Sequence, residues 1–508
     1  MVATIRTVSF EGVNVQDIEV QVQLTPGLPA FTLVGLPDKA VSESRERVRS
    51  AIHAMGLSLP ARKMTVNLSP ADIAKEGSHF DLPIALAVLI AMQVVPQDAL
   101  DGCVAMGELA LDGRIQPSSG ILPAAIDANS KDLRLICPEA NGSEAALSGH
   151  DDIWAAPSLL ALLNHIQGKQ LLATPSPPPL EEAVPLVDMR DIKGQPIARR
   201  ALEVVAAGGH NLLLSGPPGA GKSMLAAALP GILPPMDSQE MLETSMIASI
   251  AGMLQKKGVQ RNRPYRDPHH NCSMPAMVGG GKRVMPGEIS LAHNGVLFLD
   301  ELPEFPVGVL ESLRQPLETG NVSIARAAAH VTFPSRFQLV AAMNPCRCGY
   351  IADATRACSK APKCGENYRA KISGPLLDRI DITLEVEDVP TLDMLHAPEG
   401  EPSADIAKRV AAARALQVER YAAQGLDIRN NAQLTGEQVV RSVQLDKTAT
   451  ELLEQATGQL SLSMRGYHRV LKVARTVADL EGSETVKHAH VAEALSYRQL
   501  QYAPQVVA

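Results

Sequence analysis

The run GPPGAGKS, residues 216–223, has the composition and spacing of a loop that binds the phosphates of a nucleotide. An apolar, strand-like run precedes it and a helix-forming run follows it. Glycines in such a loop let backbone N–H groups turn toward the phosphates, Lys222 is predicted to reach the β- and γ-phosphates, and Ser223 is predicted to bind Mg²⁺. The residues predicted to hold the nucleotide and its ion are Gly216, Pro217, Pro218, Gly219, Ala220, Gly221, Lys222, Ser223 and, from a later strand, Asp300.

Two further apolar runs end in polar residues that suit the same chemistry. GVLFLDE, residues 295–301, ends in two carboxylates. Asp300 is predicted to complete the Mg²⁺ site with Ser223, and Glu301 to activate or orient the attacking water. FQLVAAMN, residues 337–344, ends in Asn344, whose carboxamide can orient water without adding charge. An Asn before a proline is also typical of a turn, and both interpretations stand at this point.

Two arginines are further candidates for catalysis. Arg379 in SGPLLDRIDITLEV follows a short helix-like stretch and precedes a strand, and Arg465 in LSMRGYHRVLKVARTVADL lies at a helix start. An arginine from a neighbouring subunit can stabilise charge on a transferring phosphoryl group. From the residues alone, a surface salt bridge is the more common explanation for either arginine.

Four of the seven cysteines lie close together after the Asn344 run: Cys346, Cys348, Cys358 and Cys364. Their C-x-C and C-x₅-C spacings differ from the paired C-x₂₋₄-C of most structural zinc sites. Yet their loop has little apolar content, and a metal would anchor it. Zinc, free thiols and a redox role are the alternatives. The adjacent histidines of RPYRDPHHNC, residues 263–272, suit one metal poorly, so we predict a structural or subunit-interface role for that segment.

These residues lie within a chain of 508 residues, which is long enough for two to four domains. A strand-and-helix block extends to about residue 170, a proline-rich and acidic linker follows over 171–186, and a second alternating block ends near residue 389. The rest has helical patterning. The apolar run at residues 82–92 is too short to span a bilayer, so it is predicted to be a buried helix. We see no secretion signal and expect a cytoplasmic protein with no membrane partner.

Two segments could contact a polyanion despite the net charge of −8, because the local field decides such binding. NVSIAR and AAHVTF are predicted to form a β-hairpin with Arg326 near its tip. MVGGGKRVMPGE, residues 277–288, carries Lys282 and Arg283 on a glycine-rich loop. Basic loop tips suit tracking along single-stranded DNA. Solvated loop tips without a partner are the alternative.

Taken together, GPPGAGKS, GVLFLDE, AAMNP, SGPLLDRID and SMRGYHR resemble the YifB/ComM family of magnesium-chelatase-like AAA+ ATPases, and the resemblance covers essentially the whole chain. It implies an α/β AAA+ P-loop NTPase core over 187–389 with a candidate four-cysteine insert at 346–364, and a C-terminal helical lid over 390–508. It also implies a homo-oligomeric ring, usually a hexamer, that binds ATP and Mg²⁺ between subunits. By resemblance Asn344 is sensor 1, Arg379 the arginine finger acting in trans, and Arg465 sensor 2, acting either in cis or in trans.

The first block, residues 1–170, resembles the family's N-terminal ChlI-type domain, an α+β domain similar to the Lon protease (ribosomal S5 domain 2-like) fold. KEGSHFDLP resembles the loop that carries the serine of such proteases, but Ser78 is displaced by one position and His79 takes its place. No lysine occurs in SSGILPAAID, where a partner base is expected. A serine without a base is a weak nucleophile, so we predict a non-proteolytic domain.

The resemblance favours an ATP-driven DNA helicase that promotes branch migration during homologous recombination and natural transformation. A protein-remodelling ATPase is the alternative, although such rings usually present an aromatic residue where this chain has Met277. A magnesium-chelatase motor subunit is less favoured, because the chain has no integrin-like DxSxS motif and carries the extra Lon-like domain.

Overall fold

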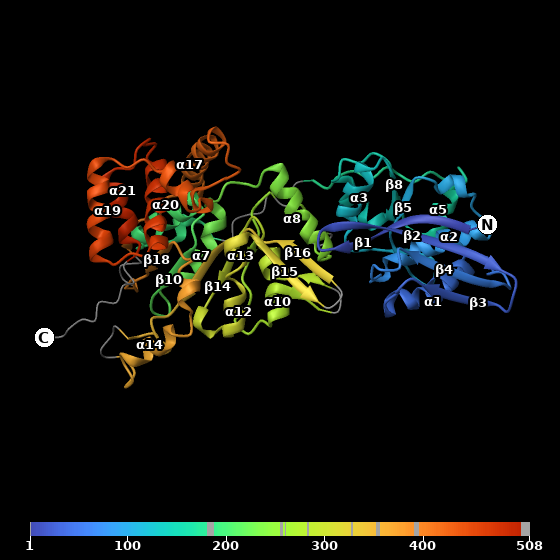
Figure 1. Cartoon of the computed structure of the whole chain (residues 1–508), viewed down its shortest axis with the longest axis horizontal. Coiled ribbons are helices and arrows are strands. Elements are labelled where there is room, and N and C mark those ends of the chain that lie inside the picture. Colours follow the sequence, from blue (N-terminus) through green and yellow to red (C-terminus); the bar gives the residue numbers. More distant parts are fainter. Residues whose placement is uncertain are drawn as a thin grey trace.

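The computed structural model describes residues 2–179, 187–254, 258–259, 261–281, 284–326, 329–351, 356–390 and 396–498. The molecule is elongated and has three parts (Figure 1). An N-terminal unit with a large sheet forms one end, a group of helices forms the other, and a second sheet with its own helices lies between them. Among the described helices, none is long and apolar enough to cross a membrane.

The N-terminal unit is built on a seven-stranded sheet in the order β3-β4-β2-β1-β5-β8-β9. β1, β2 and β4 pair antiparallel, whereas β1-β5-β8-β9 and β3-β4 pair parallel. The strands and helices are β1 (Val2–Glu11), β2 (Asn14–Thr25), β3 (Ala30–Val34), α1 (Lys39–Ala54), β4 (Lys63–Ser69), α2 (Asp81–Ala91), β5 (Cys103–Ala105), β6 (Glu108–Leu109), β7 (Ile115–Gln116), α3 (Ile121–Ser130), β8 (Arg134–Pro138), α4 (Gly142–Ala146), β9 (Ile153–Ala156) and α5 (Leu159–Ile166). The predicted buried helix is confirmed as α2, which is buried over almost its full length.

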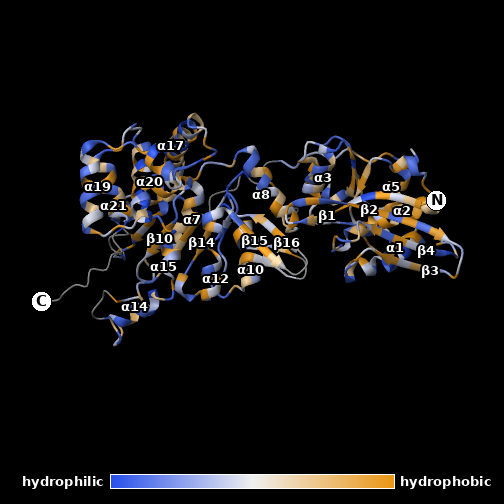
Figure 2. Ribbon diagram, viewed as in Figure 1, coloured by the Kyte–Doolittle hydropathy of each residue, from blue (hydrophilic) through white to orange (hydrophobic). Residues whose placement is uncertain are grey.

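The central unit contains a parallel five-stranded sheet in the order β11-β14-β17-β10-β18. Its strands are β10 (Leu212–Ser215), β11 (Tyr265–Arg266), β14 (Val296–Leu299), β17 (Gln338–Met343) and β18 (Ile382–Glu385). Every residue of β10, β14 and β17 is buried, as expected for parallel strands covered on both faces. Figure 2 shows the corresponding concentration of hydrophobic residues along the strands. The three apolar runs predicted as buried strands are therefore confirmed.

The connections of this sheet carry helices and two small hairpins. They are α6 (Pro196–Gly208), α7 (Lys222–Ala228), α8 (Ser238–Ile250), α10 (Met274–Val278), β12 (Gly279–Gly280), β13 (Met285–Pro286), α11 (Glu288–Leu291), α12 (Val307–Ser312), α13 (Pro316–Thr319), β15 (Asn321–Arg326), β16 (Ala329–Pro334), α14 (Lys363–Arg369) and α15 (Gly374–Leu377). β15 and β16 pair antiparallel with Arg326 opposite Ala329, so the predicted hairpin is confirmed.

This hairpin and α8 join the central unit to the N-terminal one. Ile250, at the end of α8, packs in one apolar cluster with Val331 and Phe333 of β16 and with Phe10 of β1. A Cβ on Gly12 would lie 2.5 Å from the carbonyl oxygen of Thr332, which shows how closely the two units approach. β16 therefore packs against the end of β1, where the central unit meets the N-terminal unit (Figure 1).

The C-terminal part consists of helices: α17 (Ser403–Ala423), α18 (Glu437–Ser442), α19 (Lys447–Gln459), α20 (Met464–Leu480) and α21 (His488–Ser496). α20 is the central one, and ten of its residues are buried. Its apolar face shares one core with α6 and with β10 of the central sheet. The chain thus has the predicted fold class: a mixed α/β protein with a parallel P-loop sheet and a C-terminal helical region.

Candidate active site

The phosphate loop connects β10 to α7 and depends on its glycines. Gly219 and Gly221 have φ angles of 86° and 84°, in the left-handed region that glycine adopts without steric cost. Gly216 lies against the backbone of the next strand, because a Cβ there would be 2.1 Å from the carbonyl oxygen of Val386. The loop therefore has a backbone that other residues could not reproduce without strain.

Lys222 begins α7 and is almost fully buried. Its Nζ donates to the carbonyl oxygens of Gly216 (2.8 Å) and Pro217 (2.7 Å) and to Oδ1 of Asn344 (3.1 Å). Burial lowers the pKa of Lys222, although the nearby carboxylates of Asp300 and Glu301 act in the opposite direction. The ammonium group is thus held by acceptors of its own loop, and the strand end that carries Asn344 lies within reach of it.

Ser223, in the first turn of α7, and Asp300, which follows β14, come together. The Ser223 hydroxyl donates to Oδ2 of Asp300 at 2.8 Å, and this pair of oxygen donors is of the kind that Mg²⁺ prefers. The other oxygen of Asp300 accepts from the backbone N–H of Glu301 at 2.8 Å. Glu301 itself has φ 51° and ψ 48°, a left-handed conformation that is rare for a residue with a side chain. The two carboxylates consequently have different neighbours.

The neighbour of Glu301 is His270, a residue that the sequence interpretation missed. Oε2 of Glu301 lies 3.4 Å from Nδ1 of His270, and the ring centroids of His270 and His269 are 4.1 Å apart with the planes tilted by 31°. The contact arises because β11, which precedes the histidines, pairs parallel with β14, which precedes Glu301. Two strands of a parallel sheet end at the same edge, so this pairing brings His270 to Glu301, and no local sequence pattern marks the contact.

Arg379 and Arg465 line a different part of the molecule. Both border a cleft of about 1090 Å³ between the central unit and the helices α17 and α20. Arg379 Nη2 lies 2.5 Å from Glu318 Oε2, and its Nη1 donates to the carbonyl oxygen of Pro375 at 2.7 Å. The cations that line the cleft are Arg263, Arg336, Arg379, Arg414, Arg429, Arg465, Arg469 and Lys472. Its described lining contains none of Lys222, Ser223, Asp300, Glu301 and Asn344.

Contacts of α20 fix these two arginines relative to each other. Arg469, one turn after Arg465, donates from Nη1 to the carbonyl oxygen of Ile380 at 2.7 Å. Its Nη2 lies 3.2 Å from Oδ1 of Asp378, the residue before Arg379. The start of α20 and the segment after α15 are therefore joined, and they present Arg379 and Arg465 to one cleft.

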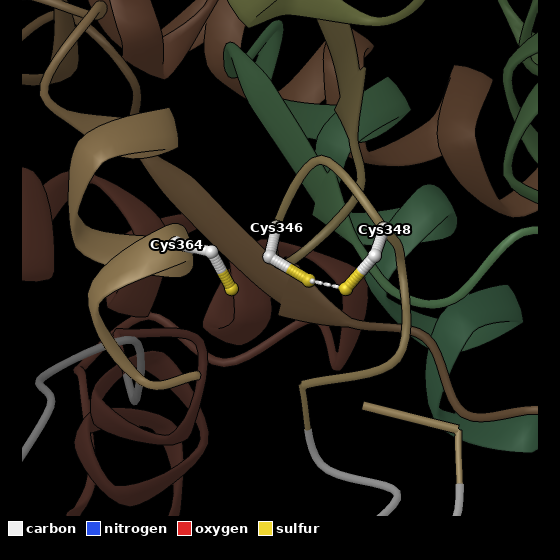
Figure 3. A group of neighbouring side chains, drawn as sticks. All are labelled: Cys346, Cys348 and Cys364. Carbon is white, nitrogen blue, oxygen red and sulfur yellow. Dashed lines mark hydrogen bonds between the residues drawn. The ribbon is translucent and has the colours of Figure 1, made fainter. Parts of the chain in front are cut away.

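Three of the predicted DNA-contacting residues fall outside the description. Arg326 ends β15 but its side chain is outside the described part, and Lys282 and Arg283 lie outside the described residues. In the cysteine loop, the Sγ atoms of Cys346, Cys348 and Cys364 lie within 4.8 Å of one another (Figure 3). Cys358 is not within that group of three.

In the N-terminal unit, Ser78 and Lys75 have separate partners. The Ser78 hydroxyl donates to a carboxylate oxygen of Glu108. The Lys75 ammonium is fully buried and donates to the carbonyl oxygen of Pro70, and burial lowers its pKa. His79 is buried and makes a ring-nitrogen contact of 2.9 Å with the carbonyl oxygen of Val8. These contacts give the serine a carboxylate neighbour rather than an amine.

Comparison with known proteins covers nearly the whole chain. Residues 188–394 match the family model of magnesium chelatase, subunit ChlI, while residues 20–141 and 400–498 match the models of the ChlI subunit of Mg-chelatase and of the ChlI C-terminal region. The chain is 42% identical to protein YifB of Salmonella typhimurium over 98% of this chain and 97% of that protein. It is 43% identical to competence protein ComM of Haemophilus influenzae over 96% and 95%. The 38 kDa magnesium-chelatase subunit of Rhodobacter capsulatus is 25% identical over 62% of this chain and 88% of that subunit.

Proposed function

Since the chain belongs to the YifB/ComM family of magnesium-chelatase-like AAA+ ATPases, we propose that it is a ring-forming motor that acts on DNA. Its activity is that of a helicase that promotes branch migration during homologous recombination and natural transformation. The single observation that carries the motor is the convergence of Lys222, Asn344, Ser223 and Asp300 at one edge of the parallel sheet. The DNA substrate is supported by the similarity, over nearly its full length, to a protein named for competence.

Each residue of the site has a separate role in the proposed ATP hydrolysis. The amide groups of residues 216–221 and the ammonium group of Lys222 bind the phosphates. Ser223 and Asp300 would hold Mg²⁺, which neutralises charge on the β- and γ-phosphates when it is bound. Glu301 accepts a proton from the attacking water or orients that water, and Asn344 positions it beside the γ-phosphate. ATP and Mg²⁺ are thus the proposed cofactors, and zinc at the four cysteines is a further one, argued below.

In this proposal Arg379 acts on the nucleotide of a neighbouring subunit, whereas Arg465 acts either in cis or in trans. Both arginines face one cleft whose described lining lacks Lys222, Ser223, Asp300, Glu301 and Asn344, which supports action of Arg379 in trans. A homo-oligomeric ring, such as a hexamer, places Arg379 of one subunit beside the phosphates of the next. In such a ring, residues 187–389 form the motor, 390–508 the lid, and 1–170 a non-proteolytic collar attached through the 171–186 linker.

DNA would be contacted by the basic tips of two loops. The hairpin β15–β16 directly precedes β17, the strand that Asn344 follows, so the chain connects it to the nucleotide site over a short distance. Arg326 at its end, with Lys282 and Arg283 of the glycine-rich loop, would bind phosphate groups of the DNA backbone. Met277 is fully buried, which leaves the loop without the exposed aromatic residue that protein-remodelling rings use. This burial favours DNA over the alternative polypeptide substrate.

The test is an ATPase and branch-migration assay of the wild type and of Glu301→Gln. Single-stranded or branched DNA should stimulate ATP hydrolysis by the wild type, and the protein should move a four-way junction. The variant should bind ATP and DNA but stall, because its amide cannot take a proton from water. No stimulation by any DNA, together with stimulation by an unfolded polypeptide, would replace the DNA motor by the protein-remodelling alternative. Normal turnover by the variant would overturn the role of Glu301.

A further inference from the structure

The cysteines that follow β17 converge, although the chain supplies them from separate places. Cys346 and Cys348 lie in the turn after Asn344, and Cys364 lies in the first turn of α14. Their side chains point toward one another from these two elements (Figure 3). Cys358 lies outside this group of three, on the stretch of chain that leads to α14, and its thiol is a neighbour of those of Cys348 and Cys364. The cysteine cluster therefore consists of three sulfur atoms that lie together and a fourth, that of Cys358, beside them.

The dimensions of the cluster suit a metal rather than a disulfide. Sγ of Cys346 lies 3.0 Å from Sγ of Cys348, well beyond the roughly 2.05 Å of a covalent S–S bond. In a tetrahedral zinc site with Zn–S bonds of about 2.3 Å, the sulfur atoms are separated by roughly 3.8 Å. The three sulfurs lie within 4.8 Å of one another, and the Cys346–Cys348 pair is closer together than in a zinc site. Small movements of the Cys346 and Cys348 side chains would complete the tetrahedron.

Packing gives these cysteines no other reason to be together. Cys103 and Cys137 are buried and belong to the apolar cores of the N-terminal unit. Cys346 is equally buried, yet within the described part of the chain it belongs to none of the apolar cores. Arg347, Lys360 and Lys363 lie between the first and last cysteines and would offset the negative charge of four thiolates around a divalent ion.

The cluster also touches the phosphate loop. Gly349, next to Cys348, packs so closely that a Cβ on it would lie 2.5 Å from Cδ of Pro218 in the phosphate loop. Gly365, next to Cys364, packs on Pro345, where a Cβ would lie 3.2 Å from the carbonyl oxygen. Pro345 follows Asn344, whose side chain accepts from Lys222. Whatever fixes the cluster therefore fixes two sides of the nucleotide site.

We propose that Cys346, Cys348, Cys358 and Cys364 bind one zinc ion, and that this zinc site braces the phosphate loop against the end of β17. Binding converts the four thiols to thiolates and releases their protons to solvent. The closed set of four protein ligands gives a structural site, with no position left for a substrate. Only the effect on the nucleotide rests on the proposed ATPase activity, whereas the binding of zinc stands independently of it.

The first test measures metal in the full-length protein purified without chelator. The wild type should contain about one equivalent of zinc per chain, and Cys364→Ser should lose most of it. Cobalt added to metal-free protein should give the intense visible absorption of tetrahedral thiolate coordination. Cys103→Ala, a buried cysteine of the N-terminal core, is the matched control and should keep its zinc. Zinc below about a tenth of an equivalent, or equal zinc in both variants, would overturn the site.

The second test separates bracing from simple folding. Zinc removed from the wild type by a chelator should lower ATP turnover by roughly tenfold or more, since small misplacements of catalytic groups have effects of that size. Unfolding of the N-terminal unit, followed through Trp154, should not change. Re-addition of zinc should restore turnover to the wild type but not to Cys364→Ser. Unchanged turnover in protein shown to be metal-free would overturn the brace and leave both the zinc site and the ATPase assignment standing.

Discussion

At the scale of single residues, two adjacent carboxylates are directed to different partners by one unusual backbone conformation. Asp300 has extended-strand residues before it and contacts Ser223, whereas Glu301 adopts φ 51° and contacts His270. A left-handed conformation costs a residue with a Cβ roughly 1–2 kcal/mol. Such strain persists where the surrounding structure enforces it, and here the Glu301 N–H bond to Asp300 does so. The strain is consistent with a site in which one carboxylate binds metal and the other faces water.

The contact between His270 and Glu301 leads to the first prediction. His270→Ala should lower the kcat of ATP hydrolysis by roughly tenfold or more, because the carboxylate that handles the water loses the group that orients it. Binding of ATP should change little, since the contacts of His270 in the described part of the chain are with Glu301, His269 and Phe305. Steady-state kinetics and binding of a fluorescent ATP analogue measure the two quantities. His269→Ala is the matched control, and equal losses in both variants would contradict the role of His270.

The site residues that could be predicted from the sequence are those marked by a pattern within a short stretch of the chain. Lys222 and Ser223 are specified by a motif of eight consecutive residues, and Asp300 and Asn344 by their place at the ends of apolar runs. Each of these signals is local. His270 has no such signal, because its contact with Glu301 depends on the pairing of β11 with β14. The sequences of β11 and β14 do not show that these two strands are neighbours in the sheet. The roles of all these residues remain predictions, whereas their positions are now known.

At the scale of elements, the turn after β17 and the phosphate loop are packed as one piece. Gly349 is buried, has φ 84° and meets Pro218 with no space for a side chain. The sequence predicted the β17 strand, the cysteine loop and the phosphate loop separately, because each has its own composition. It did not predict their contact, which depends on the turn of the chain after Asn344.

This contact leads to a second prediction. Gly349→Ala should weaken ATP binding by roughly tenfold, equivalent to about 1.4 kcal/mol, because the new Cβ displaces Pro218 and the amide groups beside it. Gly425→Ala is the matched control, since Gly425 also has a positive φ, 70°, but has no atom within 4 Å of the added Cβ. Both variants carry the cost of the left-handed backbone, and only the first disturbs the loop. Titration with a fluorescent ATP analogue compares them, and equal affinities would show that the contact does not matter for ATP.

At the scale of the whole molecule, the three units are joined by elements that also border the sites. α20 links the C-terminal helices to the segment of Arg379, and α8 with the β15–β16 hairpin links the central unit to the N-terminal unit. The sequence predicted the order of the units from changes in composition. It did not predict that the hairpin packs on β1, because that interface is made of a few apolar residues from distant segments.

A third prediction concerns the arrangement of subunits. Lys222→Ala and Arg379→Ala should each abolish ATP hydrolysis, whereas a mixture of the two should recover part of it. Some interfaces of a mixed ring combine an intact phosphate loop from one variant with an intact arginine from the other. The same mixing experiment with Arg465→Ala tests whether that residue also acts in trans. A double variant, Lys222→Ala with Arg379→Ala, is the control partner and should restore nothing. A mixed ring that stays inactive despite proven co-assembly would contradict action in trans.

The joint between the central unit and the N-terminal unit contains a buried carboxyl group. Glu144 accepts from the hydroxyl of Ser249, near the end of α8, and from the side chain of Asn141 at 2.7 Å. The backbone N–H of Leu122 donates to Oε1 of Glu144 at 3.3 Å. The backbone N–H of Gly120, just before α3, donates to the carbonyl oxygen of Ser249 at 3.0 Å. Burial raises the pKa of Glu144, and these hydrogen bonds offset only part of that effect. The carboxyl group therefore binds its proton more tightly in the folded chain than in the unfolded one.

This difference determines how the joint responds to pH, which is the fourth prediction. A carboxyl group with a raised pKa contributes its full stability below the unfolded value and loses it as pH rises through the folded value. A difference of one in pKa between the two states corresponds to about 1.4 kcal/mol. Glu144→Gln has no proton to lose, so its stability relative to the wild type should increase as pH rises from about 5 to 8. Thermal unfolding measured at several pH values tests this, with the exposed neighbour Glu139→Gln as control. Parallel pH profiles for wild type and Glu144→Gln would contradict it, because the joint would then be insensitive to the charge at its centre.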